Sequence, residues 1–210
     1  MKKFFEMGGV IAGAFLVLFG IGAIVIGFTG RSEVRSNVQR EAIVGSHDMT
    51  PSAIKSEAAK AGLKNIALPT CSVANEPITT GDEAKCFASY MRIHTLESTG
   101  GLTYSQMGRF LDEQGKQTND ESAAAVDPKT KRPVENLARN IWVTETALTT
   151  ALNTSFFAER VALFSIVMGF ALLLTGIGFL VLAWFGVLKV RPTTEASKAK
   201  AKAGAALPTA

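Results

Sequence analysis

Two long apolar runs, one near each end of the chain, are separated by a polar segment. Met7–Gly30 holds 24 residues without a formal charge, and Val161–Leu188 holds 28. A helix needs about 20 apolar residues to cross the hydrocarbon core of a bilayer. The pattern therefore predicts two transmembrane helices, with the lipid bilayer as a partner, joined by the 130-residue segment Arg31–Arg160.

A cleaved signal peptide is the alternative interpretation of the first run, because Lys2 and Lys3 precede it. The apolar core of a signal peptide holds about 7–15 residues. The first run is longer and continues through the bulky residues Ile24, Val25 and Ile26. We therefore expect it to be retained as a membrane span.

Formal charge is distributed unevenly along the chain. The residues before the first run carry +1, those after the second run carry +4, and the segment between them carries −1. Lys and Arg next to a span stay cytoplasmic, whereas long loops cross largely regardless of charge. We expect a plasma-membrane protein with residues 1–6 and a disordered basic tail, 189–210, in the cytoplasm and residues 31–160 outside. The basic pI then reflects topology and does not indicate nucleic-acid binding.

The chain has two cysteines, Cys71 and Cys86, and both lie in the segment predicted to be outside. Two cysteines in an oxidising compartment most simply form one disulfide. Closing a loop of this length would stabilise the fold by about 3 kcal/mol in the chain-entropy model. Two free buried thiols are the alternative.

Small residues recur every seventh position in both apolar runs. This spacing keeps them on one helix face, and small residues allow helix backbones to approach closely in lipid. We predict the antiparallel contact between the two spans at Gly13, Gly20, Gly27, Gly169, Gly176 and Ala183. A second small face that includes Gly9 is available for a protein partner or a homo-oligomer.

Helix signals dominate the segment between the spans. Thr80 and Glu83 form a capping box, and Pro51 and Gly62 have the positions favoured at a helix start and just past its end. The signals predict helices over Arg31–Val44, Thr50–Gly62, Thr80–Ser98 and Thr103–Gly115, then a mobile loop over Gly115–Arg132. Strand patterns are nearly absent, which favours an all-α class.

A row of apolar and small residues leads into the second span at alternating steps of four and three, the spacing of a coiled-coil seam. It consists of Leu137, Ile141, Thr144, Leu148, Ala151 and Ser155. Pro133 suits the first turn of a helix over Val134–Leu188. The predicted fold is an all-α membrane protein. Its two spans form an antiparallel hairpin that extends outside the membrane and carries a small helical cap, against which Trp142 packs.

Candidate chemistry is sparse. His47 and His94 are the two histidines of the chain. His94 and Glu97 lie one helical turn apart, a spacing that can begin a metal site. However, the stripe formed with Ala84, Phe87 and Met91 favours a hydrogen-bonded core position for His94, and Asp48 or Thr50 is better explained as a helix cap. Zinc, haem, P-loop and nucleophile-elbow motifs are missing from the sequence. We expect no enzymatic activity, no cofactor and no bound metal.

Two stretches of the chain, His94–Met107 and Asn153–Val167, resemble a group of actinobacterial two-span membrane proteins of uncharacterised function. Those proteins pair a small external helical domain with a motif like ASFxRxSLF at the entry to the second span. The resemblance implies the same topology and a cell-envelope location. Some of the group are labelled aromatic ring-opening dioxygenase, but the two-histidine, one-carboxylate iron site of such enzymes is not recognisable in this sequence.

The expected function is that of a non-enzymatic accessory or scaffold subunit, which presents the domain between its spans to partner proteins. The alternative is an extracytoplasmic sensor or binding protein for a small molecule. In that case the cap binds the molecule, and the helices that form the seam transmit the resulting conformational change.

Overall fold

The computed structural model describes residues 2–185, with side chains from residue 7 onward. The predicted tail, 189–210, and the end of the second apolar run lie outside the described residues. The chain divides into two compact units. We call the described part of the first, residues 2–27 and 164–185, the helix pair, and the second, residues 28–163, the middle domain.

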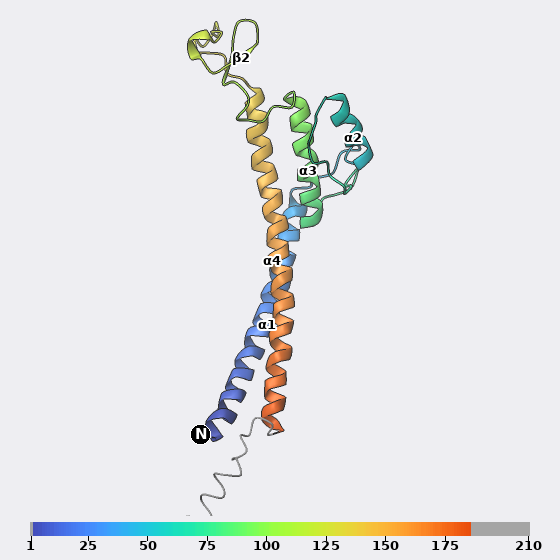
Figure 1. The fold of residues 1–210 in the computed structure, drawn as a ribbon, viewed down its shortest axis with the longest axis vertical. Coiled ribbons are helices and arrows are strands. Elements are labelled where there is room, and N and C mark those ends of the chain that lie inside the picture. Colours follow the sequence, from blue (N-terminus) through green and yellow to red (C-terminus); the bar gives the residue numbers. More distant parts are fainter. Residues whose placement is uncertain (1, 186–210) are drawn as a thin grey trace, which may run out of the picture. The chain divides into compact units, whose positions relative to one another are not determined.

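Helices make up most of the described chain (Figure 1). Two short strands and a 3-10 turn lie between α3 and α4 in the sequence. The elements are α1 (Lys2–Arg40), α2 (Pro51–Lys60), α3 (Gly81–Ser98), β1 (Phe110–Leu111), β2 (Gln117–Thr118), the 3-10 turn Glu121–Ala123, and α4 (Ala138–Trp184).

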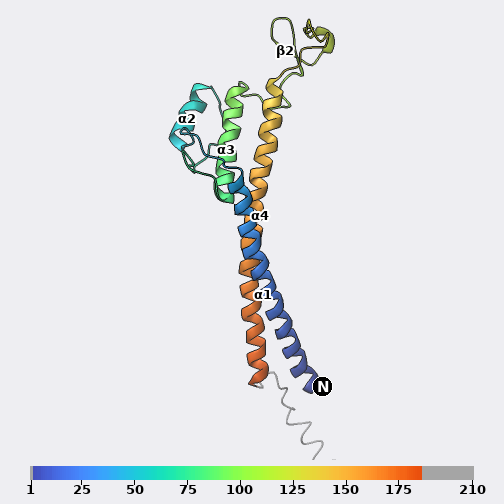
Figure 2. The same ribbon diagram turned by 180° about the vertical axis from the view of Figure 1, so that it is seen from behind.

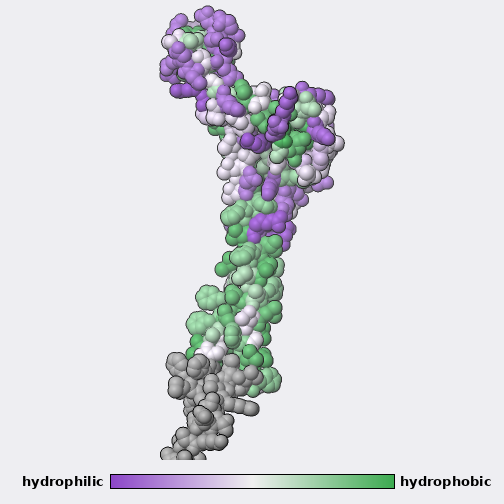
Figure 3. Space-filling view, viewed as in Figure 1, coloured by the Kyte–Doolittle hydropathy of each residue, from purple (hydrophilic) through white to green (hydrophobic). Residues whose placement is uncertain are grey.

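The helix pair has the composition of membrane helices. Both α1 and α4 contain a stretch long and apolar enough to cross a bilayer. Large apolar side chains of the pair are exposed, among them Phe19, Ile26 and Leu174, and hydrophobic residues predominate on the face seen in Figure 3. Such a continuous apolar surface is unfavourable in water and suits the interior of a lipid bilayer.

Within the helix pair, glycines bring the backbones of α1 and α4 together (Figures 1 and 2). A Cβ on Gly20 would lie 2.7 Å from the Leu173 nitrogen and 2.8 Å from the Gly169 oxygen, and one on Gly13 would lie 3.0 Å from the Gly176 oxygen. Gly27 is buried, and Ala183 is half-buried. Four of the six predicted positions thus face one another directly.

The core of the middle domain lies between α2 and α3, which pack side by side (Figures 1 and 2). Its fully buried side chains include Ile54 of α2, Tyr90 of α3, and Val73 and Ile78 from the connector between these helices. Val38 of α1 and Leu152 of α4 pack into the same cluster.

Local signals at the ends of α2 and α3 act as predicted. The Thr50 side chain accepts the Ala53 N–H at the start of α2. Thr80 and Glu83 form the capping box of α3, which ends at Ser98 before two glycines with positive φ. The helices predicted over 50–62 and 80–98 are therefore confirmed, and an irregular connector joins them.

The helix predicted over 103–115 is wrong. The residues form turns and then strand β1, which pairs with β2 in antiparallel register, Phe110 opposite Thr118. The Asp112 carboxylate accepts the N–H groups of Gln114 and Lys116, and Gly115 takes a φ of +75°, so the five residues between the strands form a tight connection. This small sheet also corrects the all-α class, although the chain is mostly helical.

The predicted helix boundaries around the middle domain also need correction. α1 ends at Arg40 rather than Val44, because Val44 forms a β-bridge with Pro77. α4 begins at Ala138, since Pro133 lies before it in a bridge with Val126. The segment 115–132, predicted to be a mobile loop, is held by backbone hydrogen bonds, including Ala125 N–H to the Leu111 oxygen at 2.9 Å.

The buried face of α4 is displaced by one residue from the predicted seam. Trp142, Glu145, Leu152 and Glu159 are buried, whereas the predicted positions Leu137, Ile141 and Leu148 are 68%, 42% and 36% exposed. The prediction failed because the buried face contains two glutamates, Glu145 and Glu159, whereas the neighbouring row is more apolar in sequence. The packing of Trp142 is confirmed. Its ring is buried beside Leu96 and Met107, and its N–H donates to the Leu102 oxygen at 2.9 Å.

Candidate functional site

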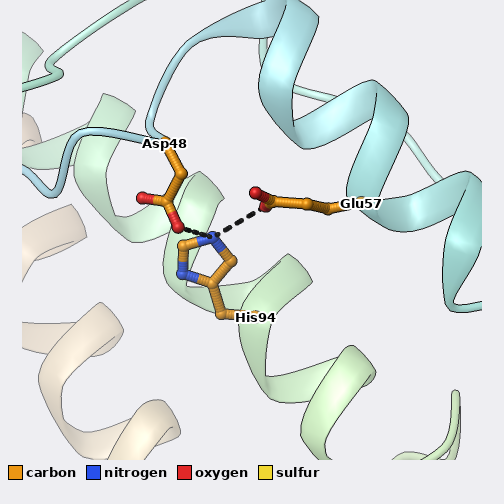
Figure 4. Close-up of side chains that lie close together, drawn as sticks. All are labelled: Asp48, Glu57 and His94. Carbon is orange, nitrogen blue, oxygen red and sulfur yellow. Dashed lines mark ion pairs between the residues drawn. The ribbon is translucent and has the colours of Figure 1, made fainter.

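Three potential metal ligands meet in the middle domain, each from a different element (Figure 4). Asp48 lies in the turn before α2, Glu57 on α2 and His94 on α3. The His94 Nε2 atom is 3.7 Å from Asp48 Oδ2 and 3.7 Å from Glu57 Oε2. One ligand atom of each residue lies within 4.8 Å of the other two.

The Asp48 turn is held by backbone hydrogen bonds to the connector between α2 and α3. The Gly45 N–H donates to the Glu76 oxygen at 2.9 Å, the Asn75 N–H donates to the Gly45 oxygen at 2.9 Å, and the Val73 N–H donates to the Met49 oxygen at 3.2 Å. A Cβ at Gly45 would lie 1.8 Å from the Val73 oxygen, so this close approach requires glycine.

The connector is in turn fixed to α3, the helix that carries His94. Cys71 of the connector and Cys86 of α3 form the predicted disulfide, with their Cα atoms 6.1 Å apart. The Tyr90 hydroxyl, also on α3, donates to the Cys71 oxygen at 2.6 Å. Asp48 and His94 are therefore positioned relative to each other by one covalent bond and a set of hydrogen bonds through the connector.

The His94 Nε2 atom is buried and has no hydrogen-bond partner among the described residues. The side chain as a whole is 29% exposed. At 3.7 Å, its two nearest carboxylate oxygens are beyond the range of a hydrogen bond. The prediction of a hydrogen-bonded core position is therefore wrong for this atom, which is the one directed at Asp48 and Glu57 (Figure 4).

The carboxylates around His94 differ in their surroundings. The hydroxyl of Ser46 donates to Asp48 Oδ1, and this bond holds the pKa of Asp48 below its ordinary value, against the opposing effect of burial. Burial raises the pKa of Glu97, and the negative charges of Glu57 and Asp48 raise it further. Glu97 thus adds a third carboxylate to the electrostatic environment of His94.

Sequence reasoning found part of this cluster. It singled out His94 with Glu97, but Asp48 and Glu57 are the carboxylates nearest to Nε2. Thr50 caps α2, which leaves Asp48 free to face His94. His47 is exposed and is not part of the cluster. No local signal links positions 48, 57 and 94, because the folded connector alone brings them together.

A second charged group, Glu159 of α4, joins three helices of the middle domain. Its Oε1 atom accepts hydrogen bonds from Arg31 Nε at 2.9 Å and Arg35 Nε at 2.8 Å. Its Oε2 atom accepts the backbone N–H of Gly81, the first residue of α3, at 2.7 Å. All of these groups have partners, so we assign Glu159 a structural role. The spacing of Arg31 and Arg35 by one turn was the signal available in the sequence.

The predicted seam of α4 forms an exposed apolar row. Leu137, Ile141 and Leu148 are the large residues in it. Where the row continues past Leu148, a groove of about 290 Å³ lies between α4 and the C-terminal end of α1 with the residues that follow it. It is lined by Asn37, Val38, Glu41, Ile43, Leu148, Ala151, Leu152 and Ser155.

Comparison with known proteins identifies no relatives. No family model matches the chain, and no curated protein or solved structure shows significant similarity to it.

Proposed function

We propose that this protein is a non-enzymatic accessory subunit of the plasma membrane, anchored by two spans, which presents its middle domain to a partner protein outside the membrane. The observation that carries the proposal is the exposed row on α4. Ile141 and Leu148 of α4 are seven residues apart, Leu137 lies just before the helix, four residues before Ile141, and all three side chains are exposed. A row of exposed large apolar side chains on one side of a helix is a feature of protein-interaction sites.

The geometry of the row favours a helix as the binding partner. Apolar positions that alternate by four and three residues form the stripe along which two helices pack with knobs in holes. The groove beside Leu148 extends this stripe, and its apolar lining includes Val38 of α1, Leu152 of α4, and Ile43 from the segment after α1. We therefore assign the row to an amphipathic helix of a partner protein.

The membrane anchorage and topology rest on composition and charge. The helix pair exposes apolar side chains over lengths suited to a bilayer. Basic residues are in excess in the two terminal segments and not between the spans, which favours cytoplasmic termini. The Cys71–Cys86 disulfide supports an oxidising location for the middle domain.

The proposal is tested by purifying the full-length protein in mild detergent and identifying stoichiometric partners by mass spectrometry. We expect Ile141→Glu to remove the partner, because a charge on the row would have to be buried on binding. Val143→Glu is the matched control. Val143 is 54% exposed on the same helix, but it lies off the row.

Loss of the partner in the Ile141 variant and its retention in the Val143 variant would support the proposal. Recovery of the wild-type protein only as a monomer would overturn it. A defined homo-oligomer that persists in the Ile141 variant would also contradict the assignment of the row, and would direct attention to the small faces of the helix pair.

A second candidate function is ligand binding by the middle domain. The specific observation in its favour is the unpartnered Nε2 atom of His94 between two carboxylates. The exposed row and this cluster are independent features, so the two functions can be tested separately.

A further inference from the structure

We propose that Asp48, Glu57 and His94 bind a divalent transition-metal ion, with Zn²⁺ as the best match. The inference concerns the ligand-binding candidate and does not depend on a partner at the α4 row. The donor set is one imidazole nitrogen and two carboxylate oxygens, all of which are established zinc ligands. It also replaces our expectation, from the sequence, that the chain binds no metal.

The distances match a metal site better than a hydrogen-bonded histidine. Zinc bonds of about 2.0–2.2 Å at a tetrahedral angle place two ligand atoms roughly 3.4 Å apart. The observed separations of Nε2 from the two carboxylate oxygens are both 3.7 Å. A charge-assisted hydrogen bond between imidazolium and carboxylate would instead close to about 2.7–2.9 Å. The observed spacing is thus nearer to that of ligands around a shared ion.

The burial of this nitrogen adds a cost that a bound ion would remove. Nε2 of His94 is buried without a hydrogen-bond partner in the described part of the chain. A buried polar atom in this state is unfavourable. An ion between Nε2, Asp48 Oδ2 and Glu57 Oε2 would satisfy the nitrogen and both oxygens together.

The charge of the site also favours a cation. Asp48 and Glu57 face His94 directly, and the carboxylate of Glu97 interacts with the same three residues. Three carboxylates around one imidazole leave a net negative charge. The hydroxyl of Ser46 binds the other oxygen of Asp48, an outer contact of the kind that orients a metal ligand.

The surroundings make the site both accessible and well positioned. The side chains of His94, Asp48 and Glu57 retain exposures of 29%, 25% and 33%, so an ion can enter from solvent. The disulfide and the backbone bonds of Gly45 and Met49 hold the elements that carry the ligands. Three protein ligands leave a fourth coordination position open for water or another ligand.

The experiment uses the full-length protein in mild detergent, purified with a tag that contains no histidine. Zn²⁺ binding is measured by competition with a chromophoric chelator, and Co²⁺ is added as a spectroscopic probe. We expect one equivalent of metal and the visible d–d absorption of four-coordinate Co²⁺. Added Zn²⁺ should also raise the unfolding temperature, because a ligand that binds the folded state stabilises it.

Two variants and a matched control keep the test decisive. His94→Gln and Glu57→Gln should each weaken Zn²⁺ binding by more than about tenfold, since even outer contacts of a metal site contribute about 10–100-fold. His47→Gln removes the other histidine of the chain, which is exposed in the neighbouring turn, and should bind as the wild type does. Unfolding temperatures without metal show whether each variant is folded, and the conservative Glu57 change provides a second reading if His94→Gln fails to fold.

Absence of Zn²⁺ and Co²⁺ binding by the wild-type protein would overturn the proposal and leave the cluster as an ion pair only. Equal binding by the wild type and both variants would overturn it as well, because the metal would then be held elsewhere. Neither result bears on partner capture by α4, so failure of the metal site and failure of the accessory-subunit proposal can be told apart.

Discussion

The carboxylate of Glu159 accepts a hydrogen bond from the backbone N–H of Gly81 at 2.7 Å, across 78 positions of sequence. This bond joins α4 to the first turn of α3, where N–H groups have no partner within the helix. The other oxygen of the same carboxylate binds Arg31 and Arg35 of α1. Three helices of the middle domain are thereby connected through one side chain.

Glu159→Ala is expected to destabilise the middle domain by about 2–3 kcal/mol. The substitution removes hydrogen bonds to a charged group and leaves the buried Gly81 N–H without a partner, and each effect is of this order. The two arginines remain partly exposed and can be solvated, which limits the loss. Thermal unfolding of the full-length protein in mild detergent measures the change.

The control for this variant is Arg160→Ala. Arg160 pairs with Asp82 at an exposed position, where a surface ion pair contributes about 0–1 kcal/mol. Equal losses of stability in the two variants would show that the buried position of Glu159 has no special importance.

Reduction of the Cys71–Cys86 bond should lower the stability of the middle domain by about 3 kcal/mol, because the unfolded chain regains the entropy that closing a loop of this length removes. The bond should also block both thiols, so that maleimide labels the protein isolated from the membrane only after reduction. Labelling without reductant would contradict both the disulfide and the oxidising location. A Cys71→Ser/Cys86→Ser variant, which should not respond to reductant, is the control.

Gly20→Ala should destabilise the helix pair by about 1–3 kcal/mol, the usual cost of overpacking. The new Cβ would lie 2.7 Å from the Leu173 nitrogen, a backbone atom that cannot move aside on its own. Gly22→Ala is the matched control, because nothing lies within 4 Å of the Cβ position there. Unfolding temperatures in detergent compare the two, and equal temperatures would refute the close contact at Gly20.

The capping box of α3 should make the middle domain sensitive to acid. Burial raises the pKa of Glu83, but three hydrogen bonds from Thr79 and Thr80 outweigh burial and leave the pKa below its ordinary value of 4.5. A carboxyl with a lowered folded-state pKa stabilises the fold above its unfolded pKa. That contribution is lost as pH falls through the folded-state value.

We therefore expect the unfolding temperature to decrease as the pH falls below 4.5. The decrease should be less steep in Glu83→Gln. The amide cannot lose a negative charge, so its contribution changes little with pH. Glu113→Gln, at an exposed position between β1 and β2, is the control and should follow the wild type. The same slope in all three proteins would show that Glu83 does not contribute to acid sensitivity.

Local signals in the sequence were sufficient for α2, α3 and the disulfide. A cap, a proline at the first turn or a terminal glycine acts within a few residues, so Thr50 and the Thr80–Glu83 pair could be interpreted without the fold. The Asp112–Gly115 turn was also readable in the sequence, since Asp and Gly at these positions favour a tight turn between strands. It was missed because strands of two residues show no alternating pattern.

Features that depend on several elements could not be predicted in this way. Hydropathy assigned the interior of α4 to Leu137 and Ile141, whereas the buried face carries Glu145 and Glu159. Glu159 can be buried because Arg31, Arg35 and the backbone N–H of Gly81, all distant in sequence, donate hydrogen bonds to its carboxylate. The Asp48, Glu57 and His94 cluster has the same origin, since a fold of the connector brings its members together.

The connector has a consequence for the order in which the protein matures. Its hydrogen bonds position Asp48, while Cys71 secures it to the helix that bears His94. Before export, with the thiols reduced, the ligands belong to elements that lack this covalent link. Under the proposed topology, full affinity for metal would develop only after translocation and oxidation, so the newly made chain would compete poorly for metal inside the cell.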